Sequence, residues 1–378
     1  MNPILKYLKN VFATKRVLGD DPTLTGLVKA DAVLQDMYAD DKFPGLAITV
    51  LKEGKTIFQK GYGYADLDTK KYVDPKSSIF RIASVSKPIA ATALAHMVQE
   101  GLISLDESFY TYLPDYPKKK WDFTIRQLAS HTAGMRVYKG KEFALNEPFG
   151  IKDSLSIFKN DPLVFEPGTE YLYNSFDWVM ISAAMQEANG IPFEAYVQEK
   201  VLDPLGMKNT YIPRRHPDDN LKQSDIDVNA IATSEAQNNI TVFYTKSLSG
   251  FRKATPVDIF YKLAGGGYLS TSEDIAKFGQ AFLDQKVGVN EAILNQFLTA
   301  QLVNGNSTYY GLGWQVSEDA KGRKFFGHVG SGVGGYSNFF VYPKEQLVFS
   351  ILINSTDPKV QEDLDVVIDS FFDELDYN

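Results

Sequence analysis

The composition excludes several classes of protein before any motif is considered. The chain of 378 residues has no cysteine, which rules out disulfide bonds, thiol nucleophiles and cysteine-ligated zinc. No apolar run approaches the roughly 18 residues of a membrane span, so we expect no stable span. Acidic residues outnumber basic ones by 47 to 39, a net charge of −8, and we therefore expect no nucleic-acid partner. The 44% hydrophobic and 23% charged shares are those of a folded globular chain.

The absence of cysteine does not identify the compartment. Residues 1–21 are basic and mildly amphipathic, but they lack the continuous apolar core and cleavage site of a secretory signal. We interpret them as a surface helix or tail, with a targeting peptide or a membrane-surface helix as alternatives. The expected location is periplasmic or extracytoplasmic if an export signal was removed, and otherwise cytoplasmic.

Strand patterns lie at the two ends of the chain. The expected strands are residues 46–51, 56–59, 310–316, 324–328, 337–342 and 347–353. The segment 347–353 is apolar on both faces, so we expect a central strand that is covered on both sides. Helices are expected at residues 25–42 and 358–374, before the first strand and after the last. The simplest fold pairs the end strands in one antiparallel sheet and places both terminal helices on one face.

Helical periodicity dominates the middle of the chain. Expected helices follow Pro88 as far as Gly101 and cover residues 177–189 and 272–283. Residues 214–255 form a polar stretch without a clear period, which is typical of a loop beside a binding site.

These patterns predict an α/β protein of the α+β type with two domains. Residues 22–80 and 305–378 would form the sheet domain, and residues 81–304 would form a mostly helical domain. We expect the active cleft between them.

A serine and a lysine open the strongest helical pattern. Ser84 and Lys87 are three residues apart, so on a helix their side chains share a face. Such a pair offers a hydroxyl nucleophile and an amine that can take its proton. Pro88 marks the first turn, where the backbone N–H of Ser84 is a free donor for a developing oxyanion. Alone the pattern is weak, because a serine that caps a helix and is followed by a solvated lysine gives the same sequence. Ser86 is another candidate for the cap.

Two further stretches support a catalytic interpretation. Residues 166–175, Glu-Pro-Gly-Thr-Glu-Tyr-Leu-Tyr-Asn-Ser, form a turn that leads into a helix, and residues 326–332, Phe-Gly-His-Val-Gly-Ser-Gly, form a strand edge that runs into glycines. With these motifs the sequence resembles the serine beta-lactamase-like family. That family comprises class C beta-lactamases, DD-peptidases, related esterases and the mitochondrial beta-lactamase-like serine hydrolase. The resemblance covers residues 43–353, includes residues 124–134 and 264–271, and implies a beta-lactamase/transpeptidase-like fold.

The resemblance implies a role for each matching residue. Ser84 matches the nucleophile that becomes acylated, and Lys87 matches its general base. Tyr173 matches the tyrosine that carries a proton to the leaving group. The N–H of Ser331, which follows Gly330, matches the second oxyanion donor beside that of Ser84.

Two departures from the beta-lactamase pattern narrow the substrate. Ser175 replaces an amide that would hydrogen-bond the acyl side chain. His328 stands where many members carry a lysine, and an imidazole, mostly neutral at pH 7, holds a carboxylate less strongly than a permanent cation. Both changes favour an esterase or peptidase over an efficient beta-lactamase.

The proposed base must have an unusual pKa. A free lysine has a pKa near ~10.4, so only about 1 in 2,500 is neutral at pH 7. Lys87 therefore needs burial or a cationic neighbour to lower its pKa. The Lys87 cation is expected to favour the phenolate of Tyr173, so that the two groups titrate as a coupled pair and either can be the base.

We thus expect a serine hydrolase that forms an acyl-enzyme on Ser84 and acts on a small ester, amide or peptide. The alternative is a non-catalytic, penicillin-recognising sensor or scaffold with the same fold, which has no physical need of Ser84 and Lys87 one turn apart. No cofactor and no metal are expected, because the four histidines lack metal-site spacing and His131 is assigned to holding a turn. Gly265-Gly266-Gly267 is expected to let the backbone approach the site closely. The oligomeric state stays open.

Overall fold

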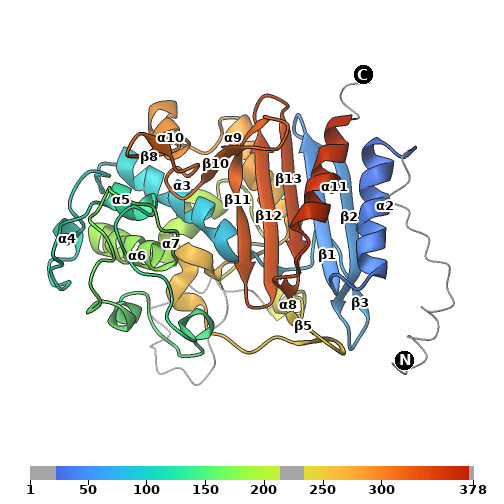
Figure 1. Cartoon of the computed structure of the whole chain (residues 1–378), viewed down its shortest axis with the longest axis horizontal. Coiled ribbons are helices and arrows are strands. Elements are labelled where there is room, and N and C mark those ends of the chain that lie inside the picture. Colours follow the sequence, from blue (N-terminus) through green and yellow to red (C-terminus); the bar gives the residue numbers. More distant parts are fainter. Residues whose placement is uncertain (1–22, 213–233, 374–378) are drawn as a thin grey trace.

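The two ends of the chain meet in one sheet. The computed structural model describes residues 23–212 and 234–373. Its main sheet has seven strands in the order β10-β11-β12-β13-β1-β2-β3, and all neighbours are antiparallel (Figure 1). Strand β1 (Gly45–Lys52) pairs with β13 (Leu347–Ile353) along their whole length. The predicted pairing of the end strands is therefore confirmed, and β13 is the central strand of the seven.

The other elements have the following bounds. The sheet is completed by β2 (Lys55–Asp66), β3 (Lys71–Tyr72), β10 (Gln315–Glu318), β11 (Lys324–Gly332) and β12 (Gly335–Tyr342). Shorter strands are β4 (Phe80–Arg81), β5 (Tyr244–Ser247), β6 (Gly250–Lys253), β7 (Leu269–Ser270), β8 (Leu302–Val303), β9 (Asn306–Ser307) and β14 (Ser355–Thr356). The α-helices are α2 (Gly26–Ala39), α3 (Ser86–Gln99), α4 (Phe109–Tyr112), α5 (Ile125–Ala129), α6 (Phe176–Asn189), α7 (Phe193–Val197), α8 (Ser234–Gln237), α9 (Ser272–Leu283), α10 (Glu291–Phe297) and α11 (Gln361–Asp373).

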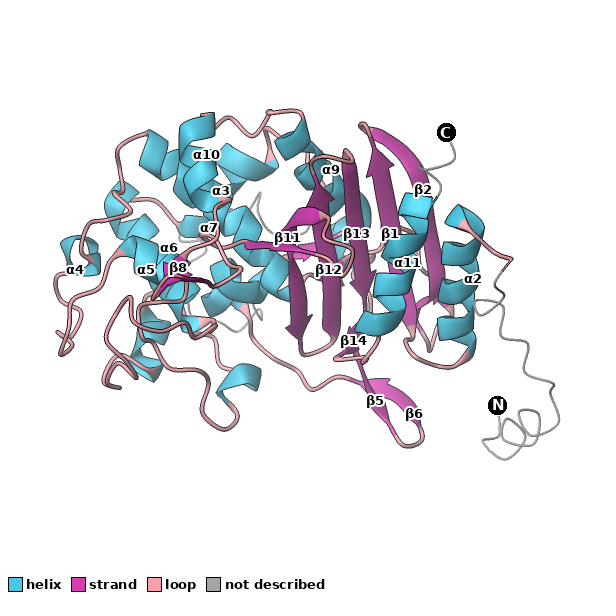
Figure 2. Cartoon of the chain, turned by 45° about the horizontal axis from the view of Figure 1, so that its top comes forward, coloured by secondary structure: helices cyan, strands magenta, loops and turns pink. Residues whose placement is uncertain are grey.

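Alternation along β1 divides the core into two layers. Ile48 belongs to the same apolar cluster as Leu34 of α2 and Val367 of α11, so both terminal helices cover one face of the sheet. The preceding side chain, Ala47, belongs to the cluster that contains Phe278 of α9 on the opposite face. Figure 2 shows α2 and α11 side by side over the sheet, with α9 behind it. The predicted placement of the terminal helices is confirmed.

Helix α9 lies very close to the sheet, and its sequence explains why. The helix begins at an N-cap threonine, Thr271, whose side chain accepts a hydrogen bond from the N–H of Asp274. A Cβ added at Gly279 would lie 2.6 Å from Val348 and 2.7 Å from Phe339, so only glycine allows this approach. The helix has the bounds predicted from the periodicity, residues 272–283.

Two regions differ from the sequence prediction. The strand expected at residues 310–316 is instead a turn followed by β10, because Gly313 has a φ of +83° and its Cα lies against the ring of Trp178. A Cβ at Gly313 would come within 2.5 Å of that ring. Part of the aperiodic stretch 214–255 is also regular, since β5 and β6 form a hairpin and β5 pairs with β14.

Some predictions fall on other parts of the chain. The expected tail or helix at residues 1–21, and the part of the predicted loop up to residue 233, lie outside the described residues. The division into a sheet domain and a helical domain stays a prediction. Within residues 23–212 and 234–373, no helix combines the length and the apolar character needed to cross a membrane.

Candidate active site

Ser84 lies in a tight turn that leads into α3, a helix of which most residues are buried. The turn, Ala83–Val85, is a short 3₁₀ helix that continues directly into α3. Ala83 has a φ of +46°, a left-handed conformation that costs a residue with a Cβ about 1–2 kcal/mol. The turn is held from the other side by β11, because a Cβ at Gly330 would lie 2.5 Å from the carbonyl oxygen of Ile82 and 3.0 Å from the nitrogen of Ser84. The nucleophile candidate is therefore fixed between a helix start and a sheet strand.

Three functional groups meet at this turn. The Nζ of Lys87 lies 3.1 Å from the Oγ of Ser84 and 2.8 Å from the hydroxyl oxygen of Tyr173. The Tyr173 hydroxyl donates to the Ser84 Oγ at 2.7 Å. The three side chains thus form a closed ring of hydrogen bonds in which each touches both others. Tyr173 comes from the segment that leads into α6, 86 residues beyond Lys87.

Lys87 is buried, and no carboxylate of the described residues is in contact with its amine. Its side chain is 0% exposed, and the third acceptor of its amine is the carbonyl oxygen of Gly265 at 2.7 Å. The pKa of Lys87 is lowered from 10.5 to about 7. Burial is the largest cause, the charge of Asp177 opposes it, and the charge of Lys262 adds to it. Lys87 therefore meets the requirement for a base at neutral pH, because a large fraction of the amine is uncharged.

The expectation for Tyr173 was wrong. We expected the lysine cation to favour the phenolate, but burial is the largest influence and raises the pKa of Tyr173 well above its ordinary value of 10. The hydrogen bond with Ser84 opposes this change without reversing it. Tyr173 is therefore a phenol at neutral pH, and the geometry favours Lys87 as the base.

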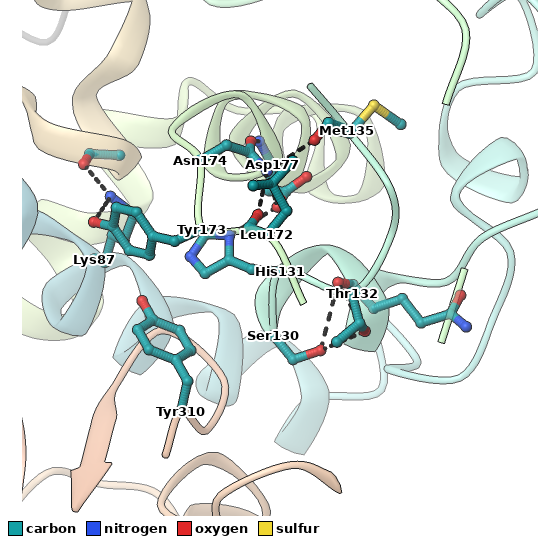
Figure 3. Close-up of polar contacts among 12 residues, drawn as sticks. Lys87, Ser130, His131, Thr132, Met135, Leu172, Tyr173, Asn174, Asp177 and Tyr310 are labelled. Atoms are coloured by element: carbon teal, nitrogen blue, oxygen red, sulfur yellow. Dashed lines mark hydrogen bonds and ion pairs between the residues drawn. The ribbon is translucent and has the colours of Figure 1, made fainter. Parts of the chain in front are cut away.

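Behind Tyr173 lies a second set of buried polar groups (Figure 3). The His131 ring is 4.6 Å from the Tyr173 ring, and its Nδ1 lies 2.7 Å from a carboxylate oxygen of Asp177. The Asn174 amide donates to the same oxygen at 2.7 Å, and its carbonyl oxygen accepts from the N–H of Asp177. Burial lowers the pKa of His131 and raises that of Asp177, so it disfavours two full charges here. His131 does lie in a turn, since its N–H donates to the carbonyl oxygen of Leu128 and its φ is +61°.

His328 lies beside this set and is 1% exposed. Its Nδ1 lies 2.6 Å from the carbonyl oxygen of Val329, so Nδ1 carries the proton and Nε2 accepts from the Tyr310 hydroxyl at 3.0 Å. Burial, then the charge of Lys87, lowers the pKa of His328 to about 3. The imidazole is therefore neutral at pH 7, as the sequence suggested, but both of its nitrogens are already hydrogen-bonded inside the protein.

Ser84 opens onto a cavity of about 230 Å³. Its walls include the other two predicted serines, Ser175 and Ser331, together with Gly265 and Gly266. The glycines bring backbone close to the site as expected, because a Cβ at Gly265 would lie 3.1 Å from the carbonyl oxygen of Ser175. A larger cavity of about 640 Å³ lies near α11 and the edge strand β10, but Ser84, Lys87 and Tyr173 do not line it.

The structure brings most of the predicted residues together. Ser84, Lys87 and Tyr173 are in contact, and Ser84 shares its cavity with Ser175 and Ser331. His328 is not among the described residues that line this cavity, and its ring is tilted by 45° against that of Tyr173 at a centroid distance of 5.8 Å. Sequence reasoning missed the Asp177 carboxylate and the Tyr310 hydroxyl. An acidic residue in the buried first turn of a helix was the available signal for Asp177, whereas Tyr310 had none.

A known protein family matches most of the chain. The profile of the beta-lactamase family matches residues 30–370. The chain belongs to the beta-lactamase family. Members of this family are serine hydrolases, and the recognition made from the motifs is confirmed.

Individual relatives are more distant. The mitochondrial serine beta-lactamase-like protein LACTB of Homo sapiens is 27% identical over 398 residues, which cover 80% of this chain and 69% of the relative. Penicillin-binding protein 4* of Bacillus subtilis is 24% identical, over 76% of this chain and 63% of the relative.

Solved structures share the fold. D-amino acid amidase from Ochrobactrum anthropi has a TM-score of 0.76 at 21% identity and covers 91% of this chain and 98% of its own. EstCE1, described as a hydrolase with promiscuous acyltransferase activity, has a TM-score of 0.73 at 19% identity and covers 91% and 97%. The predicted beta-lactamase/transpeptidase-like fold is confirmed.

Proposed function

We propose that the protein is an esterase, amidase or peptidase that forms an acyl-enzyme on Ser84 and has weak or no beta-lactamase activity. The single observation that carries this proposal is the ring of contacts among Ser84, Lys87 and Tyr173, in which Ser84 faces a cavity. A buried, partly neutral amine beside a serine hydroxyl provides a nucleophile and its base without a histidine.

Acylation begins with transfer of the Ser84 proton. In the reactive state the Lys87 amine is neutral, so the Ser84 O–H donates to its lone pair while the amine donates to Gly265 and to Tyr173. As the Oγ attacks the carbonyl carbon, the proton moves to Nζ and the carbonyl π electrons move to oxygen. The N–H groups of Ser84 and Ser331 are our candidates for binding that oxyanion. The contact of Gly330 with the backbone of Ser84 supports this, because it brings the two segments together.

Collapse of the intermediate breaks the bond to the leaving group. Tyr173 is a phenol in contact with both other groups, so it can give its proton to the departing oxygen or nitrogen and take one back from the Lys87 ammonium. Lys87 is then neutral again. Deacylation repeats the sequence with water as the nucleophile, and the product acid leaves with Ser84 restored.

Two side chains of the site, Ser175 and His328, support the choice against beta-lactams. Ser175 offers a short hydroxyl where an amide would bind an acyl side chain from two sides. His328 is neutral, and both of its ring nitrogens have partners within the protein. We expect slow or no hydrolysis of cephalosporins beside clear hydrolysis of short-chain aryl esters. The reverse ranking of kcat/KM would refute this assignment.

A labelling experiment separates the enzyme from the scaffold alternative. Wild type, Ser84→Ala and Ser156→Ala are incubated with a fluorescent fluorophosphonate and examined by intact mass. Ser156 is an exposed serine and serves as the matched control. Adducts on wild type and on Ser156→Ala, with none on Ser84→Ala, support the acyl-enzyme. Absence of an adduct on all three proteins supports the scaffold.

A further inference from the structure

The cavity beside Ser84 is lined by two basic side chains. Arg81 is the last residue of β4, and Lys262 ends a short turn, Phe260–Lys262, before the Gly-rich segment. No Asp or Glu is among the described residues that line the cavity. Its charged wall is therefore entirely cationic in the part of the chain that the structure describes.

Arg81 has unused hydrogen-bonding capacity. Its Nη1 donates to the carbonyl oxygen of Val333 at 2.6 Å, and its guanidinium lies 4.1 Å from the centre of the Phe243 ring. Its Nε is buried, and no described residue accepts a hydrogen bond from it. A guanidinium has five N–H donors in a planar fork that suits a carboxylate, and no described carboxylate lies within ion-pair distance.

Lys262 is held in a similar way. Its amine donates to the carbonyl oxygen of Phe143 at 3.0 Å and lies 5.4 Å from the centre of the Tyr138 ring. The pKa of Lys262 is lowered from 10.5 to about 8. Burial is the largest cause, the charge of Arg81 adds to it, and the charge of Asp258 opposes it. At pH 7 the amine is still mostly charged, and among residues 23–212 and 234–373 it forms no ion pair.

We propose that Arg81 and Lys262 bind an anionic group of the substrate, so that the cavity selects acyl donors that carry a carboxylate. This inference rests on the proposed acyl-enzyme at Ser84. Two partly desolvated cations that line one cavity repel each other, and an incoming carboxylate relieves that repulsion while it accepts charge-assisted hydrogen bonds from the two side chains.

Three 4-nitrophenyl esters of equal chain length test the proposal: the hexanoate, the mono-adipate and the adipamate. The mono-adipate ends in a carboxylate, and the adipamate ends in its neutral isostere. We expect kcat/KM of wild type for the mono-adipate to exceed that for the adipamate by about 10-fold or more, and the ratio to fall with added salt. Arg81→Gln and Lys262→Gln should each reduce the ratio about 10-fold. The ratio is taken within each variant, so an effect common to all three esters, such as loss of the Lys262 charge that acts on Lys87, cancels.

Two controls separate local binding from other effects. Arg81→Lys retains the charge and should retain part of the preference, whereas loss of folding would affect all three esters alike. Lys55→Gln removes one positive charge from an exposed site outside the cavity wall and should leave the ratio unchanged.

The two proposals fail in different ways. Equal rates for the three esters, with all hydrolysis lost in Ser84→Ala, would overturn the anion preference and leave the acyl-enzyme standing. A preference that persists in both glutamine variants would overturn the assignment to these residues. If no ester is turned over, protection of Ser84 from fluorophosphonate by adipate but not by hexanamide supports the inference, and equal protection overturns it. Absence of both turnover and labelling removes the proposed function itself.

Discussion

The clearest test of the site is the pH dependence of acylation, because it depends on one buried amine. A lowering of the Lys87 pKa from 10.5 to about 7 raises the neutral fraction at pH 7 from about 1 in 3,000 to about one half. The neutral amine is the base, so the rate should rise with pH through about 7 and level off above it. Lys87→Arg cannot supply a neutral base and should lose about 10³-fold in rate.

The assay is the second-order rate of fluorophosphonate labelling of Ser84 between pH 5 and pH 9. Histidine is the usual source of an ionisation near neutral pH, but burial lowers the pKa of both His131 and His328, the latter to about 3. Tyr173→Phe should react with the fluorophosphonate more slowly but with the same midpoint, because the pKa of Tyr173 lies above the pH range of the assay. A flat profile, a midpoint above about 9, or loss of the midpoint in Tyr173→Phe would refute the assignment of the base to Lys87.

The remaining predictions concern packing and buried charge. Gly330→Ala should reduce kcat/KM for aryl esters by about 100-fold or more, because its Cβ would displace the backbone of the nucleophile, whereas Gly332→Ala on the same strand makes only an ordinary contact at 3.4 Å and should retain most activity. Lys87→Met should abolish turnover yet raise the free energy of unfolding at pH 6 by about 1–3 kcal/mol in urea titrations. The reason is that pH 6 lies below the pKa of Lys87 in the folded protein, so the wild type must bury a charged amine. This gain in stability should shrink as the pH rises from 7 toward 10, and a loss of stability at pH 6 would contradict the prediction. Asp177→Leu should cost about 3 kcal/mol in the same titrations, because the partners of its carboxylate would be left buried and unpaired, and a cost below about 1 kcal/mol would contradict that reason.

Much of the fold could be predicted because the strongest signals are local. The period of α9 and the two-sided apolar pattern of β13 are properties of short segments, and both predictions are confirmed. The turn at residues 311–314 was missed because it depends on the ring of Trp178, which is distant in the sequence. The hairpin of β5 and β6 was missed because its strands of four residues are too short for a period to be visible.

The site divides in the same way. The contact between Ser84 and Lys87 follows from helical spacing, and Tyr173 was found through a motif. The pKa of Tyr173 was predicted in the wrong direction because a sequence shows which charges are present but not how far a group is removed from water. For the same reason the cationic wall formed by Arg81 and Lys262 was not visible until the fold brought the two segments together.

The order of strands in the main sheet has a consequence for biosynthesis. Strand β1 is made early but lies between β2 and β13, so its second neighbour is made near the end of translation. Strand β11, which packs against the Ser84 turn, follows that turn by about 250 residues in the sequence, so the contact between them is far from local. A nascent chain still attached to the ribosome therefore carries Ser84 and Lys87 without the glycine strand that completes their surroundings. Hydrolytic capacity should consequently be acquired only after the C-terminal strands are released, and truncated translation products should be chemically inert.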